Sequence, residues 1–264
     1  MYDLGRVKLP VIPKKAYAAD PARTLGLLWG SHGKAGRSGL TLAAIVEKAV
    51  EIADADGFDA VSMRVLAESL QVGAMSLYTH VPGKADLTAL MIDAVYGELY
   101  ESVEAPSQQP GGWRGAAAFV ARRNWELLER HPWLLQANHG RPPIGPNLVR
   151  KYEAELRPFD GLGLNDVEID SVLVTILMHV DGVARTQASI AKDRSETGLS
   201  DDQWWLAHEP ILARAIDPDQ FPTASRVGKA SSIAYEGVFS PTHALEFGLE
   251  RILDGIELLL TKPR

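Results

Sequence analysis

The stretch that decides the fold is TLAAIVEKAVEIADADGFDAVSMRVLAESLQVGAMSLYTHVPGKADL, residues 41–87. Its first apolar residues recur at helical spacing, which predicts a helix that Asp56-Gly57 ends. Ser62 suits the N-cap of a second, short helix, and residues 71–73 then break the chain. A third helix, from Ala74 to His80, ends before a Pro-Gly pair. Two short helices joined by a tight turn form the geometry that places the second helix in a DNA major groove.

The third helix has one obvious inward residue, Leu77. Its other side chains are small or can hydrogen bond, and such groups on an exposed helix suit base edges and phosphates. The alternative is a helical hairpin packed in a bundle, with Tyr78 and His80 partly buried. The spacing alone leaves both interpretations open, because a fold by itself does not define a function.

From about residue 41 to 90 the chain resembles the DNA-binding domain of the tetracycline-repressor (TetR) family of bacterial regulators. The similarity lies in SMRVLA (62–67), LYTHV (77–81) and GKADL (83–87). Gln71 departs from the family at the start of the turn, where many members have Gly. The resemblance implies phosphate contacts by four residues, Arg64, Tyr78, His80 and Lys84, and places four more at base edges, Ala74, Met75, Ser76 and Thr79.

Charge is unevenly distributed along the chain. The net charge of −7 disfavours DNA binding, because phosphate contacts need cations. Residues 1–40, however, hold seven Lys or Arg and two Asp, a net charge of +5, and this segment is rich in Gly. We expect residues 1–40 to form a basic, flexible arm. It either adds DNA contacts or is a solvated tail.

The rest of the chain is expected to be helical, so the fold class is all-α. A DNA-binding domain at 41–104 includes a fourth helix that runs to about Val103, and a Pro- and Gly-rich loop at 105–112 separates it from a second domain at 113–264. Helices are predicted at 113–130, 147–159, 166–190, 202–216 with an interruption at Pro210, and 242–260. Residues 217–237 read as a loop with a short helix.

Two of these helices have more apolar surface than a single stripe. Residues 172–180 are apolar nearly all round, and the last helix has a second apolar set in Phe247, Leu258 and Leu259. One chain could bury both helices. In the TetR family such a pair forms a four-helix interface with a second subunit, and a reader of palindromic DNA needs two-fold symmetry. We therefore expect a homodimer.

The second domain resembles the C-terminal domain of a TetR branch common in actinobacteria. The similar segments are ERHPWL (129–134), RPPIGPN (141–147) and FGLERILDG (247–255). The resemblance implies that a small molecule binds this domain and weakens DNA affinity. Candidate pocket residues are aromatic or polar, and each could equally be an ordinary core or surface residue. They are Trp125, Gln136, Tyr152 and His179.

Other classes of protein find little support in the sequence. It has no HExxH, GxSxG, Walker A or GxGxxG motif and no cysteine, so we expect no enzyme activity, catalytic residue, metal site or cofactor. No apolar run reaches the ~20 residues of a membrane span. The expected protein is a cytoplasmic repressor that a small molecule releases from a double-stranded DNA operator. The alternatives are a DNA-binding regulator that senses a protein partner or nothing, and a helical enzyme or carrier.

Overall fold

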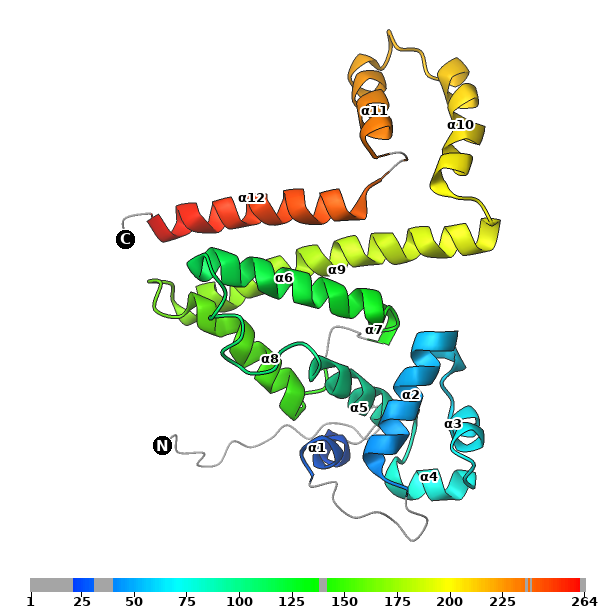
Figure 1. Cartoon of the computed structure of the whole chain (residues 1–264), viewed down its shortest axis with the longest axis vertical. Helices are drawn as coiled ribbons and strands as arrows, with labels where there is room; N and C mark the ends of the chain where they lie inside the picture. The colour runs from blue at the N-terminus through cyan, green and yellow to red at the C-terminus, as the bar shows by residue number, and fades with distance from the viewer. Residues whose placement is uncertain (1–20, 31–39, 138–141, 236, 238, 262–264) are drawn as a thin grey trace, which may run out of the picture. The chain divides into compact units, whose positions relative to one another are not determined.

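Every regular element in the part of the chain that the structure describes is a helix, which confirms the all-α class. The structure is a computed structural model and describes residues 21–30, 40–137 and 142–261, apart from 236 and 238. Its helices (Figure 1) are α1 (Pro21–Trp29), α2 (Leu42–Asp56), α3 (Met63–Ser69), α4 (Ala74–His80), α5 (Lys84–Tyr96), α6 (Gly112–Arg130), α7 (Leu134–Ala137), α8 (Pro146–Leu156), α9 (Asp166–Thr197), α10 (Asp201–Ala215), α11 (Pro222–Tyr235) and α12 (Pro241–Thr261).

The chain divides into two compact units. The first unit contains residues 1–97 and 137–150, and the second contains residues 98–136 and 151–264. The expected boundary at the loop 105–112 differs from this packing at residues 98–104 and 137–150. The second difference has a physical cause, because Asp93 of α5 accepts hydrogen bonds from the backbone N–H groups of Asn147 (3.4 Å) and Leu148 (3.0 Å).

The predicted helix-turn-helix forms α2, α3 and α4 of the first unit. The Ser62 hydroxyl accepts a hydrogen bond from the N–H of Val65 at 3.2 Å, so the predicted N-cap of α3 is confirmed. Ile45, Leu66 and Leu77, one from each helix, are fully buried. Their burial fixes α4 on the rest of the unit by one apolar side chain and leaves its other positions outside.

The turn between α3 and α4 contains a strained residue. Gln71 has a φ of 55°, and it is the one residue other than glycine with positive φ in the described ranges. A side chain at this backbone conformation meets the following carbonyl group, which glycine avoids. The departure from the family pattern at this position therefore keeps the turn and adds strain to it.

Two predictions for the first unit were wrong. The fourth helix, α5, ends at Tyr96 and not near Val103. The segment 1–40 is not flexible throughout, because Pro21–Trp29 forms α1, which packs on α5. Leu28 is the buried apolar residue of α1. The remaining basic residues of the expected arm lie outside the described residues.

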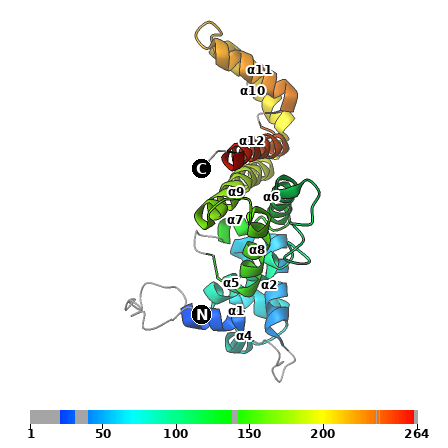
Figure 2. The ribbon, with the colours of Figure 1, turned by 90° about the vertical axis from the view of Figure 1, so that its left-hand side faces the viewer.

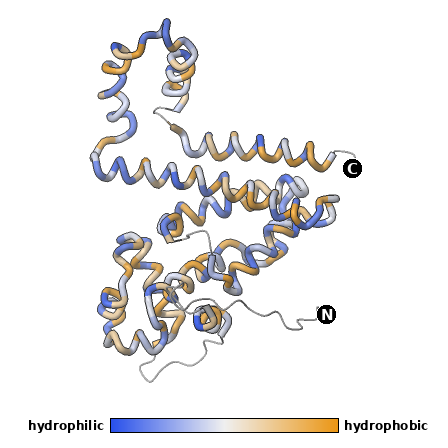
Figure 3. The backbone as a smooth tube through the Cα atoms, turned by 180° about the vertical axis from the view of Figure 1, so that it is seen from behind, coloured by the Kyte–Doolittle hydropathy of each residue, from blue (hydrophilic) through white to orange (hydrophobic). Residues whose placement is uncertain are grey.

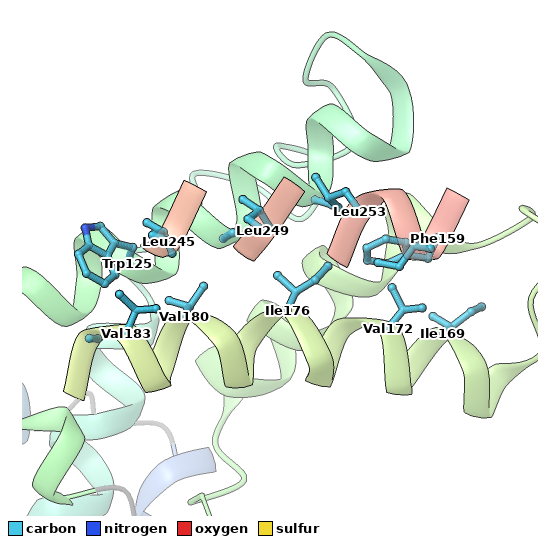
Figure 4. Close-up of a cluster of buried hydrophobic side chains, with 14 of the residues drawn as sticks. Trp125, Phe159, Ile169, Val172, Ile176, Val180, Val183, Leu245, Leu249 and Leu253 are labelled. Carbon is cyan, nitrogen blue, oxygen red and sulfur yellow. The ribbon is translucent and has the colours of Figure 1, made fainter. Parts of the chain in front are cut away.

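The core of the second unit lies between α6, α9 and α12. Figure 4 shows side chains of α9, such as Ile176, directed toward Leu249 and Leu253 of α12. Trp125 closes one end of this cluster and Phe159 closes the other. Ile176, Leu253 and Phe159 are completely buried. This cluster joins the three helices by apolar burial, which is the main favourable contribution to folding.

A buried polar network joins α6 and α8 in the second unit. Glu155 has no exposed surface, and its Oε1 accepts hydrogen bonds from Tyr100 (2.9 Å) and Asn124 (2.6 Å). Its Oε2 pairs with Nζ of Lys151 at 2.6 Å. Burial and the adjacent Glu155 carboxylate raise the pKa of Tyr100, so its hydroxyl remains a proton donor. Because each oxygen of Glu155 is bonded, its charge is tolerated in the interior.

Helices α9 and α11 are longer than predicted, and α10 is continuous where an interruption was expected. A capping box between Asn165 and Glu168 begins α9, which continues for 32 residues to Thr197 instead of ending near 190. Pro210 lies inside α10 without ending it, and α11 replaces most of the expected loop at 217–237. Figures 1 and 2 show α10 and α11 extending away from α9 and α12. Neither helix has a buried residue, although hydrophobic positions recur along both (Figure 3).

None of the helices in the described ranges is long and apolar enough to cross a membrane.

The strain at Gln71 gives a test of the turn. Replacing Gln71 with Gly should raise the free energy of unfolding by about 0.5–1 kcal/mol, because glycine adopts positive φ without a steric cost. Gln71→Ala is the control, since alanine keeps the strain and should give little or no gain. Urea denaturation followed by circular dichroism measures both, and equal stabilities for the Gly and Ala variants would contradict the strain.

Candidate nucleic-acid interface

Helix α4 presents most of its side chains outward. Met75 and Tyr78 are 77% and 44% exposed, whereas Leu77 is fully buried. Ala74 and Thr79 are exposed, and Ser76 and His80 are half-buried. Six predicted contact residues therefore lie on one short helix with its inward anchor at Leu77. A surface of this size and chemistry can enter a groove of DNA.

The two aliphatic hydroxyl groups on α4, those of Ser76 and Thr79, are not equivalent. The Thr79 hydroxyl donates a hydrogen bond to the Ser76 carbonyl at 2.6 Å. Its proton is therefore engaged within the helix, and the oxygen remains available as an acceptor. The Ser76 side chain can still donate or accept. Of the two predicted base readers, Ser76 has the wider choice of base partners.

The two predicted phosphate-binding cations lie on other helices. Lys84 is the first residue of α5, and its Nζ lies 4.8 Å from the centre of the Phe58 ring. Gly83, the N-cap of α5, offers no side-chain oxygen to the first turn, so a phosphate could accept from these backbone N–H groups. Arg64 of α3 forms an exposed ion pair with Glu68 at 3.3 Å. Exposed ion pairs contribute little stability, so Arg64 can leave Glu68 to bind a phosphate. Phe58 was not predicted as a neighbour of Lys84, although its position after the end of α2 is visible in the sequence.

The four predicted ligand residues do not form one site. Trp125 is part of the buried core, whereas Gln136 is exposed. The Tyr152 hydroxyl donates to Asp170 at 2.7 Å, and this bond raises the pKa of Tyr152. His179 is hydrogen-bonded through Nε2 to the Leu245 carbonyl at 3.0 Å and lies against Gly248. The structural interpretation of His179, a hydrogen-bonded residue between two packed helices, fits these contacts.

A cavity of about 520 Å³ lies instead where α9 ends and α10 begins. Ile190, Leu199, Trp204 and Phe239 supply apolar walls. One face of the Trp204 ring stacks on His208, with the ring centres 3.9 Å apart. The volume and the mainly apolar lining are those of a site for a small organic molecule.

The charges around this cavity are paired except for one. Arg194 donates from Nε to Asp201 at 2.7 Å, and its Nη2 makes a second contact with the same carboxylate. The Asp193 carboxylate has no ion pair or hydrogen bond with the described residues, and it lines the cavity. The cavity therefore offers an apolar volume, an aromatic ring and one free negative charge. The Trp-rich character of this domain is visible in the sequence, but no signal there points to Asp193.

The outer face of α9 and α12 is also apolar. Val167, Val174 and Met178 are 75%, 42% and 71% exposed and follow each other at helical spacing on α9. Phe247 and Leu258 are similarly exposed on α12. A groove of about 370 Å³ between the two helices continues this surface. An exposed apolar stripe along two packed helices is typical of an interface with another protein.

Two family profiles match the chain. Residues 39–91 match the bacterial regulatory proteins of the tetR family, and residues 105–260 match the tetracyclin repressor-like C-terminal domain. The first match contains α2, α3, α4 and most of α5, and the second contains α6 to α12 almost completely. The helix α1 precedes both matches.

Individual relatives agree with these profiles. The HTH-type transcriptional repressor DrrR1 of Streptomyces coeruleorubidus is 39% identical over 256 residues, which are 94% of this chain and 89% of that protein. An HTH-type transcriptional regulator of Saccharopolyspora erythraea is 34% identical over 66% of this chain and 72% of its own length. The TetR family protein ActR of Streptomyces coelicolor, in complex with actinorhodin, has a TM-score of 0.67 and 28% identity, with 83% of this chain and 95% of that chain covered. The chain belongs to the TetR family of bacterial transcriptional regulators.

Proposed function

We propose that the protein is a homodimeric repressor that reads a palindromic DNA operator through α4 and leaves it when a small molecule binds the second unit. The observation that carries this proposal is the outward display of Met75, Ser76, Tyr78 and Thr79 on α4, with Leu77 as the anchor. The relative named a repressor supports the direction of regulation. Because a bacterial DNA-binding regulator meets its operator in the cytoplasm, we also propose a cytoplasmic location.

The proposed division of labour on DNA follows from chemistry and position. Lys84, Arg64, Tyr78 and His80 contact phosphates, which give affinity without sequence preference. Ser76 and Thr79 form hydrogen bonds to base edges, and Met75 and Ala74 pack against apolar groups such as the thymine methyl. Each copy reads one half-site, and a dimer axis makes the operator a palindrome.

The exposed apolar stripe on α9 and α12 is proposed as the dimer interface. Two copies of this helix pair would form a four-helix bundle, in which the side chains of Met178 and Phe247 become buried. The resemblance to the family favours a second copy of this chain as the partner.

The effector is proposed to bind the cavity between α9 and α10. The solved structures of the similar protein ActR include complexes with actinorhodin and with (S)-DNPA, so that protein binds small organic molecules. In this chain the apolar walls, the Trp204 ring and the free Asp193 carboxylate suit a hydrophobic molecule with an aromatic part and a positive charge. Release of DNA requires only that this molecule binds the two states of the repressor with different affinity.

The DNA contacts can be tested on a duplex selected by the protein from a random library. Lys84→Ala should weaken binding to every duplex and reduce the slope of log K against log salt by about 1.8, because the proposed dimer loses one phosphate contact in each copy. Ser76→Ala should instead cost roughly 1–3 kcal/mol at particular base pairs and leave the slope unchanged. Lys229→Ala, an equal loss of charge on α11 of the second unit, is the control. Unchanged binding by a folded Tyr78→Ala/Lys84→Ala variant would place the DNA surface elsewhere.

The dimer interface can be tested with a matched pair of methionines. Met178 and Met75 are 71% and 77% exposed in the single chain. Met178→Glu should place a charge in the interface and lower the mass measured by light scattering from twice to once the 28.7 kDa of one chain. Met75→Glu should leave the mass unchanged, because α4 faces DNA. A dimeric Met178→Glu variant would argue against this interface.

The effector site can be tested with a panel of hydrophobic aromatic amines and their neutral acetylated forms. The amines should change the fluorescence of Trp204, which a Trp204→Phe variant identifies, and should release the selected duplex. Asp193→Asn should weaken amine binding about tenfold or more through the lost charge, whereas Asp219→Asn, a control on another exposed carboxylate, should not. Equal binding of amines and acetylated forms to the parent would rule out the role of Asp193.

A further inference from the structure

The helix α1 lies outside both family profiles, yet it is bonded into the first unit at both of its ends. The profiles begin at residues 39 and 105, and α1 ends at Trp29. It packs on α5, the helix that also supports α2. A helix of nine residues is too short to be stable alone in water, so it depends on these contacts.

The first contact is to a buried carboxylate of α5. Asp86 is 1% exposed, and it accepts hydrogen bonds from Nη2 of Arg23 at 2.8 Å and from the hydroxyl of Thr24 at 2.7 Å. Both donors belong to α1. A buried charge that loses its partner is strongly destabilising, whereas the Arg23 side chain, 44% exposed, keeps its water. Loss of α1 would therefore leave the buried Asp86 carboxylate without these two donors and would destabilise α5.

The second contact is to the segment that leads into α8. Nε1 of Trp29 donates a hydrogen bond to the carbonyl of Ile144 at 2.8 Å. The next residue, Gly145, lies so close to α5 that an added Cβ would be 2.2 Å from Oδ1 of Asp93. Asp93 also receives the first N–H groups of α8. Residues 144–148 are thus fixed to α1 on one side and to α5 on the other.

The two aspartates lie on one face of α5. Asp86 and Asp93 are seven residues apart, which is nearly two full helical turns. This face of α5 is buried and polar, and its partners come from α1 and from residues 144–148. The helix-turn-helix itself supplies none of the hydrogen bonds described for these two carboxylates.

We propose that α1 is a positioning helix of the DNA-binding unit, and that Arg23, Thr24 and Trp29 hold α5 in register with residues 144–148. Its role differs from a DNA contact, because the guanidinium of Arg23 and the hydroxyl of Thr24 are directed to Asp86. The orientation of α5 sets the position of α2, which packs on it, and through α2 that of α3 and α4. The effect on DNA affinity rests on the proposed function; the effect on α5 does not.

The free protein gives the first test, by hydrogen exchange of backbone amides in the full chain. Arg23→Ala should speed exchange in α5 and in residues 144–149, and Trp29→Phe, which keeps a ring but removes the donor, should speed exchange mainly in residues 144–149. Arg23→Ala/Asp86→Asn should return α5 most of the way to the parent, because the uncompensated charge is gone. The control is Arg122→Ala, which breaks an exposed pair with Glu246 in the second unit.

Binding to the selected duplex gives the second test. Arg23→Ala should weaken binding by roughly threefold to thirtyfold with the salt slope unchanged, since no phosphate contact is lost. Deletion of residues 1–20, which leaves α1 intact, should not affect exchange in α5. A fall in the salt slope with Arg23→Ala would overturn the positioning role in favour of a phosphate contact. Parent-like exchange in α5 for Arg23→Ala would overturn it too, and a parent that binds no duplex would refute the proposed function alone.

Discussion

The burial of two carboxylates on one face of α5 is the constraint around which the first unit is built. Asp86 and Asp93 lie among apolar residues, where a charge persists only with donors at hand. Burial raises the pKa of Asp93, and the N–H groups of Leu148 and Asn147 oppose that rise. The donors come from α1 and from residues 147–148, which are far from α5 in the sequence. The first unit therefore includes two segments in addition to the helix-turn-helix and α5. Apolar packing alone would not select these segments.

The second unit combines an apolar core with a buried polar network around Glu155. The cluster between α6, α9 and α12 supplies burial, which is not directional, whereas the bonds of Glu155 fix α8 to α6 at one register. Glu155 is itself a residue of α8, and its partners in this unit are Tyr100, Asn124 and Lys151.

The sequence predicted the features that depend on neighbours along the chain. Ser62 as an N-cap, Leu77 as the inward residue of α4 and the core helices α6, α9 and α12 follow from caps and from helical periodicity. It could not predict the features that depend on distant partners. Helix α1 was hidden because its key residue, Arg23, is paired 63 positions away, and the cavity at Trp204 needs the fold of α10 against α9. The residues proposed to contact DNA came from resemblance and residue chemistry, whereas those proposed to contact the effector came from the cavity between α9 and α10.

The length of α9 has a consequence for how this protein can change during evolution. The last buried residue of α9 is Ala184, and every residue from 191 to 200 is exposed. The C-terminal part of α9, after Ala184, thus has no buried residue, and it leads into α10 and α11. Each residue inserted into or removed from its exposed segment 191–197 turns the hairpin of α10 and α11 by about 100° around the axis of α9, and seven residues restore the direction to within about 20°. Apart from the cavity residues Asp193, Arg194 and Thr197, substitutions there change no buried contact, whereas single-residue insertions and deletions would redirect the whole hairpin. Viable length variants should therefore differ in steps of two helical turns.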